Sequence, residues 1–180
     1  MALLLGCSPG VSAAPDICVF APHLALASSL SPTEPRAVVP ISRPTLFIRE
    51  PLAELRIEEG SHVLWSWASQ MGEALEGPVA WPLPPLKAGQ TLTIRLRPIG
   101  ARPDASATIE LVGAPAQRLH AGDRLFQSLL GTPKAWRPTI EALLAKGDHP
   151  LATALLFANE GPNDPDLNDL RRLAVQNSCP

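Results

Sequence analysis

The chain lacks tyrosine, and only 4% of its 180 residues are aromatic. This scarcity argues against a broad aromatic platform of the kind that stacks on sugars. Charge is also sparse, because 18% of the residues are charged and the formal net charge is -2, whereas ordinary soluble domains are roughly 25% charged. A polycation that binds nucleic acid is therefore excluded, since phosphate recognition needs an excess of Lys and Arg.

Apolar residues, proline and glycine are abundant instead. A hydrophobic fraction of 46% is enough for a packed core and too high for intrinsic disorder. The 21 prolines and 12 glycines predict many short elements joined by turns. The length fits one compact domain with accessory segments and excludes two large catalytic domains.

The start of the chain lacks basic residues, and Arg36 is the first. The apolar run at residues 1–6 and the small residues at 11–14 are typical of the end of an export signal and its cleavage site. We therefore expect a signal peptide at residues 1–14, either truncated or a lipoprotein leader, and a periplasmic or secreted protein. The alternative is a buried N-terminal strand at residues 17–26. A membrane-spanning helix is excluded, because Pro, Gly and charged residues interrupt the roughly 20 apolar residues that it needs.

The leader offers two further processing sites. Leu4–Cys7 resembles the lipobox of bacterial lipoproteins, in which the cysteine becomes the acylated first residue of the mature chain. Ala25–Ala27 is a second small-x-small cleavage site. Lipidation of Cys7 is the only expected route to membrane attachment and gives a lipid-anchored protein as the alternative localisation.

Cysteine is scarce, with three in the chain. If Cys7 is removed or lipidated, Cys18 and Cys179 form an even pair, which an oxidising compartment favours as a disulfide. Two unpaired thiols are the alternative. The sequence has no C-x-x-C, and its four histidines lie far apart, so neither a metal site nor a cofactor is expected.

Residues 6–10 match the G-x-S-x-G motif of hydrolases, with Ser8 in the place of the nucleophile. That motif requires a buried strand before it and a helix after it. Few residues precede Gly6, and Pro9 with Gly10 disfavours a helix. A hydrolase is therefore the third and least favoured function, and we expect no catalytic residue and no enzyme.

Residues 15–42 are rich in proline, and the sequence predicts an extended linker there. Order is expected to begin near Arg43. Between there and residue 116, apolar residues alternate with polar ones, which indicates short strands with one buried face. Such strands favour an antiparallel β-sandwich. Turns are predicted at 59–61, 76–78, 88–90 and 99–101.

This region carries a family resemblance. Arg43–Leu46 opens a strand, Trp65 lies in an aromatic strand, and a Pro-rich stretch from Trp81 leads into a core strand at Thr93–Leu96. The pattern resembles fibronectin type III-like or immunoglobulin-like domains of exported bacterial, cyanobacterial-type proteins of unknown function. The resemblance implies adhesion or scaffolding and transfers no catalytic residue. It departs from the family at Leu92, where a tyrosine is usual.

The period becomes helical in residues 117–180. Helices are predicted up to Gly131, from Pro138 to Gly147, from Asp148 to Gly161, and from Asp164 onward. The fold class expected for the whole chain is therefore α+β, an antiparallel sandwich followed by a small C-terminal helical segment. The helices should pack on an open face or edge of the sheet.

Few residues suggest binding chemistry. Trp81 follows a strand and precedes Pro82, so we predict an exposed ligand contact there, and Arg95 is a second candidate. Glu58 and Glu59 are interpreted as a solvated hairpin end. The acidic cluster is explained by the helix dipole rather than by calcium; it comprises Asp164, Asp166 and Asp169.

The function predicted first is an exported cell-envelope protein that binds or scaffolds a protein partner without catalysis. No nucleic-acid partner is expected. The alternative is a small-ligand or glycan-binding module that uses Trp81, together with Trp67 and Arg95.

Overall fold

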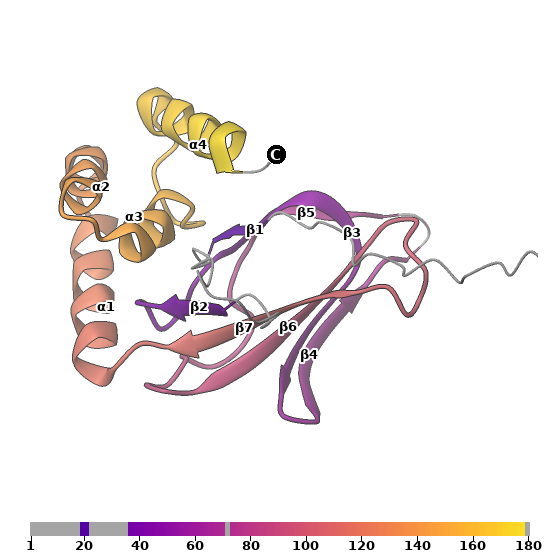
Figure 1. The fold of residues 1–180 in the computed structure, drawn as a ribbon. Helices are drawn as coiled ribbons and strands as arrows, with labels where there is room; N and C mark the ends of the chain where they lie inside the picture. Colours follow the sequence, from indigo (N-terminus) through magenta and orange to yellow (C-terminus); the bar gives the residue numbers. More distant parts are fainter. Residues whose placement is uncertain (1–18, 22–35, 71–72, 179–180) are drawn as a thin grey trace, which may run out of the picture.

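The computed structural model describes residues 19–21, 36–70 and 73–178, and combines strands with helices (Figure 1). The strands are β1 (Val19–Ala21), β2 (Arg36–Val39), β3 (Leu46–Glu59), β4 (His62–Ala68), β5 (Leu75–Val79), β6 (Thr91–Pro98) and β7 (Ala107–Gly113). The helices are α1 (Ala116–Leu130), the 3-10 helix η1 (Pro133–Ala135), α2 (Trp136–Ala145), α3 (His149–Leu156) and α4 (Pro165–Ser178). The α+β class predicted from the sequence is confirmed.

The strands belong to one mixed sheet in which β3 is the central element. β6 runs antiparallel to β3, β7 runs antiparallel to β6, and β2 joins β7 in parallel. β1, β4 and β5 each pair antiparallel with parts of the long β3. The sheet order is therefore β1-β3-β6-β7-β2, with β4 and β5 as additional partners of β3.

This sheet differs from the predicted antiparallel sandwich. The described strands are linked into one sheet, and the parallel pairing of β2 with β7 is a correction to the antiparallel prediction. The immunoglobulin-like topology is not confirmed. The reason is that period-2 alternation reveals one buried face per strand but does not say whether a second sheet or a layer of helices covers it.

Order also begins earlier than the expected start near Arg43. β2 lies within the stretch predicted as a linker, and its Ala37 and Val39 are completely buried. The strand was missed because it has only four residues between two prolines, Pro35 and Pro40. Its partner in β7 lies far along the chain, so no local pattern reveals the pairing. Within the same predicted linker, β1 pairs with the beginning of β3.

One predicted turn lies inside a strand. Gly77 and Pro78, expected to form a turn, belong to β5 and pair with β3. Pro78 is compatible with this position because β5 pairs only with β3 among the described residues, and proline is tolerated on an edge strand. The predicted turns at Gly60, Gly89 and Gly100 are confirmed, each with a positive φ.

The core lies between the apolar face of the sheet and the helices, which gather at one end of it (Figure 1). α3 is the innermost helix and contacts β1, β2, α2 and α4. Two contacts join the segment that follows α3 to the start of β3. The backbone N–H of Asn159 donates to the Thr45 hydroxyl at 3.0 Å. The ring centroids of Phe47 and Phe157 are 4.6 Å apart.

The starts of α3 and α4 follow the capping signals of the sequence, whereas α3 ends at Leu156, before the Gly161 predicted to end it, and α2 begins at Trp136, before the predicted Pro138. The Asp148 carboxylate accepts the backbone N–H of Leu151 at the start of α3. Asp164 does the same for Leu167 at the start of α4, at 3.1 Å. Such caps satisfy N–H groups that have no partner within the helix. None of the described helices is long and apolar enough to cross a membrane.

Candidate functional site: the charged face of the sheet

Charged side chains gather on the face of β3 and β6 that points away from the core. In β3, Glu54, Arg56 and Glu58 alternate with the buried Leu55 and Ile57. In β6, Arg95 and Arg97 alternate with the buried Ile94 and Leu96. Because successive side chains of a strand point to opposite faces, both sets lie on one surface. We call the set Glu54, Arg56, Glu58, Arg95 and Arg97 the charged face.

The register of β3 against β6 determines which charges meet. Glu54 is opposite Arg97, and Arg56 is opposite Arg95. The Arg97 Nε donates to Glu54 Oε2 at 3.0 Å, while Arg56 pairs with the other oxygen of the same carboxylate. The Arg95 Nε donates to Glu58 Oε2 at 2.8 Å. The two glutamates are thus shared among three arginines.

These arginines change the acidity of Glu54. Burial by itself would raise the pKa of this carboxyl, but the hydrogen bonds from Arg97 and Arg56, with the charges of both, lower it below its ordinary value of 4.5. Glu54 is therefore a stable anion at neutral pH. It is poorly suited to act as a general base, because its lone pairs already accept guanidinium N–H groups.

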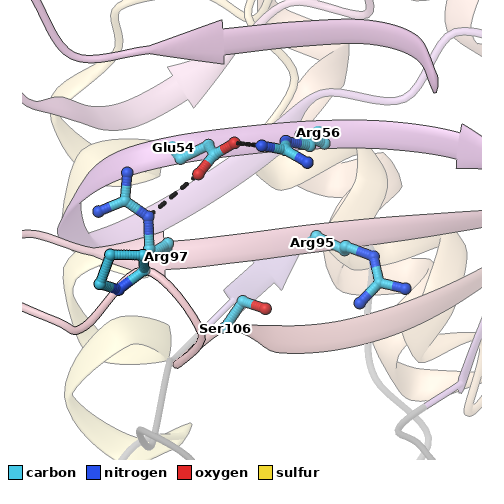
Figure 2. Close-up of a pocket in the computed structure, with 6 residues that line it drawn as sticks. Glu54, Arg56, Arg95, Arg97 and Ser106 are labelled. Carbon is cyan, nitrogen blue, oxygen red and sulfur yellow. Dashed lines mark hydrogen bonds and ion pairs between the residues drawn. The ribbon is translucent and has the colours of Figure 1, made fainter.

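A shallow hollow of about 60 Å³ opens on the charged face. Glu54 and the arginines 56, 95 and 97 line it, together with Pro103 and Ser106 from the β6–β7 connection (Figure 2). Pockets that enclose a whole small molecule usually have ~300 to 1,000 Å³. The hollow can hold one small group, and its guanidinium N–H donors suit an oxyanion.

The hollow has no catalytic arrangement. Ser106 is its only hydroxyl-bearing lining residue, and no histidine lines it to activate that hydroxyl. Within the described parts of the chain, no group of three His, Cys, Asp or Glu could hold a metal ion. The groups that the hollow presents to a ligand are guanidinium donors, one carboxylate and one hydroxyl.

The residues predicted as ligand contacts do not come together. Trp81 packs half-buried against the core, and its indole N–H donates to the Pro84 carbonyl at 3.0 Å. It lies just beyond Val79, which pairs with Leu46, whereas Arg95 pairs with Arg56. Those two positions of β3 are about 30 Å apart along an extended strand.

Trp67 also lies away from Arg95. It is paired with Leu55 and therefore shares the core-side face of the sheet, whereas Arg95 belongs to the charged face. Trp67, Trp81 and Arg95 thus lie in three different environments.

Several predicted sites fall outside the described residues. These are the lipidation site Cys7, the disulfide pair Cys18 and Cys179, and Ser8 of the G-x-S-x-G match. The lipidation and the disulfide remain predictions.

Part of the charged face differs from what the sequence predicts. Glu58 and Glu59 are interpreted above as a solvated hairpin end. Glu59 is exposed at the end of β3, but Glu58 is 9% exposed and bound to Arg95, so the interpretation is wrong for Glu58. Glu54, Arg56 and Ser106 were not singled out. The available signal was the complementary alternation of E-L-R-I-E at 54–58 and R-L-R at 95–97.

The acidic cluster around α4 is accounted for by helix structure. Asp164 caps α4, Asp166 pairs with Arg137, and Asp169 pairs with Arg172 at 2.9 Å. The Asp164 cap agrees with the interpretation that an acid at a helix start complements its dipole, whereas Asp166 and Asp169 are held in ion pairs.

Comparison with known families, curated proteins and solved structures finds no significant match to this chain.

Proposed function

We propose that the chain is a non-catalytic binding or scaffolding protein of the cell envelope, and that its protein partner adds a strand to β4. The location is periplasmic or secreted, or lipid-anchored through Cys7, and is argued from the leader-like residues 1–14. An immunoglobulin-like relationship, which the sequence suggests, belongs to the same proposal, because such domains often serve adhesion.

The observation that carries the proposal is the exposed edge of β4. Among the described residues β4 pairs only with β3, so its other edge offers unpaired backbone N–H and C=O groups. The strand contains no acidic residue, lysine, arginine or proline. Val63 is 53% exposed and Leu64 is 42% exposed. An uncharged, apolar edge of this kind is a template for strand addition.

The other edges of the sheet are protected by comparison. β5 contains Glu76 and Pro78, which discourage pairing with another strand. β2 begins with Arg36, which forms an ion pair with Glu110, and it also contacts α3. Among the described strands, β4 is a seven-residue edge strand that has neither a charged side chain nor a proline to discourage pairing. This contrast favours a partner at β4 over one at β5 or β2.

The alternative is a small-ligand or glycan-binding module that uses Trp81. It has less support, because Trp81 packs against the core and lies far from Arg95. Titrating the Trp fluorescence of the purified chain with a panel of glycans tests it. Unchanged emission across the panel would remove this alternative, and saturable quenching would restore it. A hydrolase that uses Ser8 remains the third possibility.

Site-specific photo-crosslinking in the native cells tests the β4 edge. A photoreactive amino acid at Leu64 is expected to capture a discrete protein partner. The matched control is Ile99, which is 48% exposed and lies outside the strands, and it should not capture that partner. Equal capture from both positions, or none from Leu64, would contradict the proposal.

Cell fractionation tests the location separately. With a C-terminal tag, the mature chain is expected in the periplasm, the medium or a lipid-anchored membrane fraction. Intact-mass measurement with and without reductant then determines the cleavage site, the acylation of Cys7 and the pairing of Cys18 with Cys179. A full-length cytosolic product would refute export while leaving the β4 crosslinking test intact.

A further inference from the structure

We propose that the hollow on the charged face is a binding site for a single oxyanion group, a phosphate or a carboxylate. The site lies on β3 and β6 rather than on the edge of β4. The site does not depend on the proposed strand addition or on the cellular compartment, because its residues belong to the folded chain itself and not to the β4 edge.

The sheet contains an unfavourable pairing of two like charges. Arg56 and Arg95 are directly opposite each other on neighbouring antiparallel strands. Directly opposed residues have Cβ atoms about 5 Å apart, and like charges in that position are destabilising. Glu54 pairs with Arg56 and Glu58 pairs with Arg95, which offsets part of this repulsion. An anion bound between the two arginines offsets the remainder.

The lining of the hollow carries an excess of positive charge. Three arginines and one glutamate line the hollow, which leaves an excess of two positive charges in its lining. Counting Glu58, which binds Arg95 from beside the hollow, still leaves an excess of one. The chain as a whole has a net charge of -2. The charged face is thus a local positive region on a weakly acidic protein, and it attracts anions.

The hollow also supplies hydrogen-bond donors for an anion. A guanidinium has five N–H donors in a planar fork. Arg97 uses its Nε for Glu54, and its terminal nitrogens make no further hydrogen bond within the described residues. The hydroxyl of Ser106 lies in the same hollow (Figure 2). Guanidinium N–H groups and a hydroxyl that line the same hollow suit the oxygens of phosphate or carboxylate.

The size of the hollow limits the ligand. A volume of about 60 Å³ admits one small group but not a nucleotide or a sugar ring. The side chains of Arg56 and Arg95 are 46% and 47% exposed, so the site is open to solvent. A free anion and an anionic group at the end of a larger molecule can both reach it.

Titration of the purified full-length chain tests the site. The probes are inorganic phosphate and acetate, and the readout is the NMR shift of the arginine Nε–H signals at constant ionic strength. We expect saturable shifts at Arg97 and Arg95 with at least one probe. If phosphate binds more tightly than acetate, the site prefers a phosphate group. If acetate binds as tightly or more tightly, the site accepts a carboxylate group.

Two variants connect the binding to the hollow. R56Q removes one side of the opposed arginine pair and should weaken binding roughly tenfold, because one charge-assisted contact is lost. S106A should weaken it less and leaves all arginines in place, which covers the case in which R56Q does not fold. R172Q is the matched control: Arg172 pairs with Asp169 on α4, so its removal should leave the affinity unchanged. Linear, non-saturating shifts with both probes, or equal weakening in R172Q, would overturn the proposal.

Discussion

Gly122 of α1 lies directly against the backbone that follows β2: a Cβ atom at this position would be only 2.0 Å from the carbonyl oxygen of Pro40. The next residue in the helix, Asp123, accepts the backbone N–H of Ser42 at 2.7 Å. This close approach fixes α1 against the segment between β2 and β3. The helical layer and the sheet are therefore joined through backbone contact as well as through apolar side chains.

Gly122→Ala is expected to destabilise the protein by about 2 kcal/mol. The added methyl group must displace the Pro40 backbone rather than a flexible side chain, so the overpacking cost lies near the upper end of about 1 to 3 kcal/mol. A gain of about 1 kcal/mol in helix propensity offsets part of it. Urea denaturation monitored by Trp fluorescence measures the change. Gly131→Ala is the matched control, because nothing lies within 4 Å of a Cβ there and its φ of -88° suits alanine. Similar losses in both variants would show that the close approach is not the cause.

Asp148→Ala is expected to reduce stability by about 1 to 2 kcal/mol, because it removes the cap of α3. The same carboxylate pairs with Arg118 of α1. Asp148→Ser keeps a capping oxygen and removes the ion pair, so its loss should stay below about 1 kcal/mol. Thermal and urea unfolding of both variants separate the two roles. If serine were as harmful as alanine, the ion pair rather than the cap would dominate.

The stability of the protein should fall in acid partly because of Glu54. Its pKa in the folded state lies below the ordinary value of 4.5, so the folded state favours the ionised form. The resulting stabilisation is complete above the ordinary pKa and is lost as pH falls through the lower folded value. Glu54→Gln should be less stable than the wild type at pH 7, and the two stabilities should converge toward pH 3.

Urea unfolding across pH 3 to 7 measures this convergence. Glu160→Gln, at an exposed carboxylate, is the control and should follow the wild-type curve. Parallel curves for Glu54→Gln and the wild type would show that Glu54 contributes no acid sensitivity.

Local chain chemistry by itself determined much of the fold. Alternation at Leu92, Ile94 and Leu96 predicted a half-buried strand, and β6 has this pattern. Helix signals at Asp148 and Asp164 predicted the caps of α3 and α4. These features depend on a few neighbouring residues, so the local sequence pattern predicts them.

Only the tertiary structure decided which strands meet and which residues share a surface. The parallel pairing of β2, the burial of Glu58 and the opposition of Arg56 to Arg95 all depend on register between segments distant in sequence. Alternation gives the buried face of each strand but not its neighbour, because pairing is selected by the packing of the whole core. Trp81 shows the same limit. Its position after a strand predicts exposure, but its side chain packs half-buried against the core because apolar residues from other segments lie beside it.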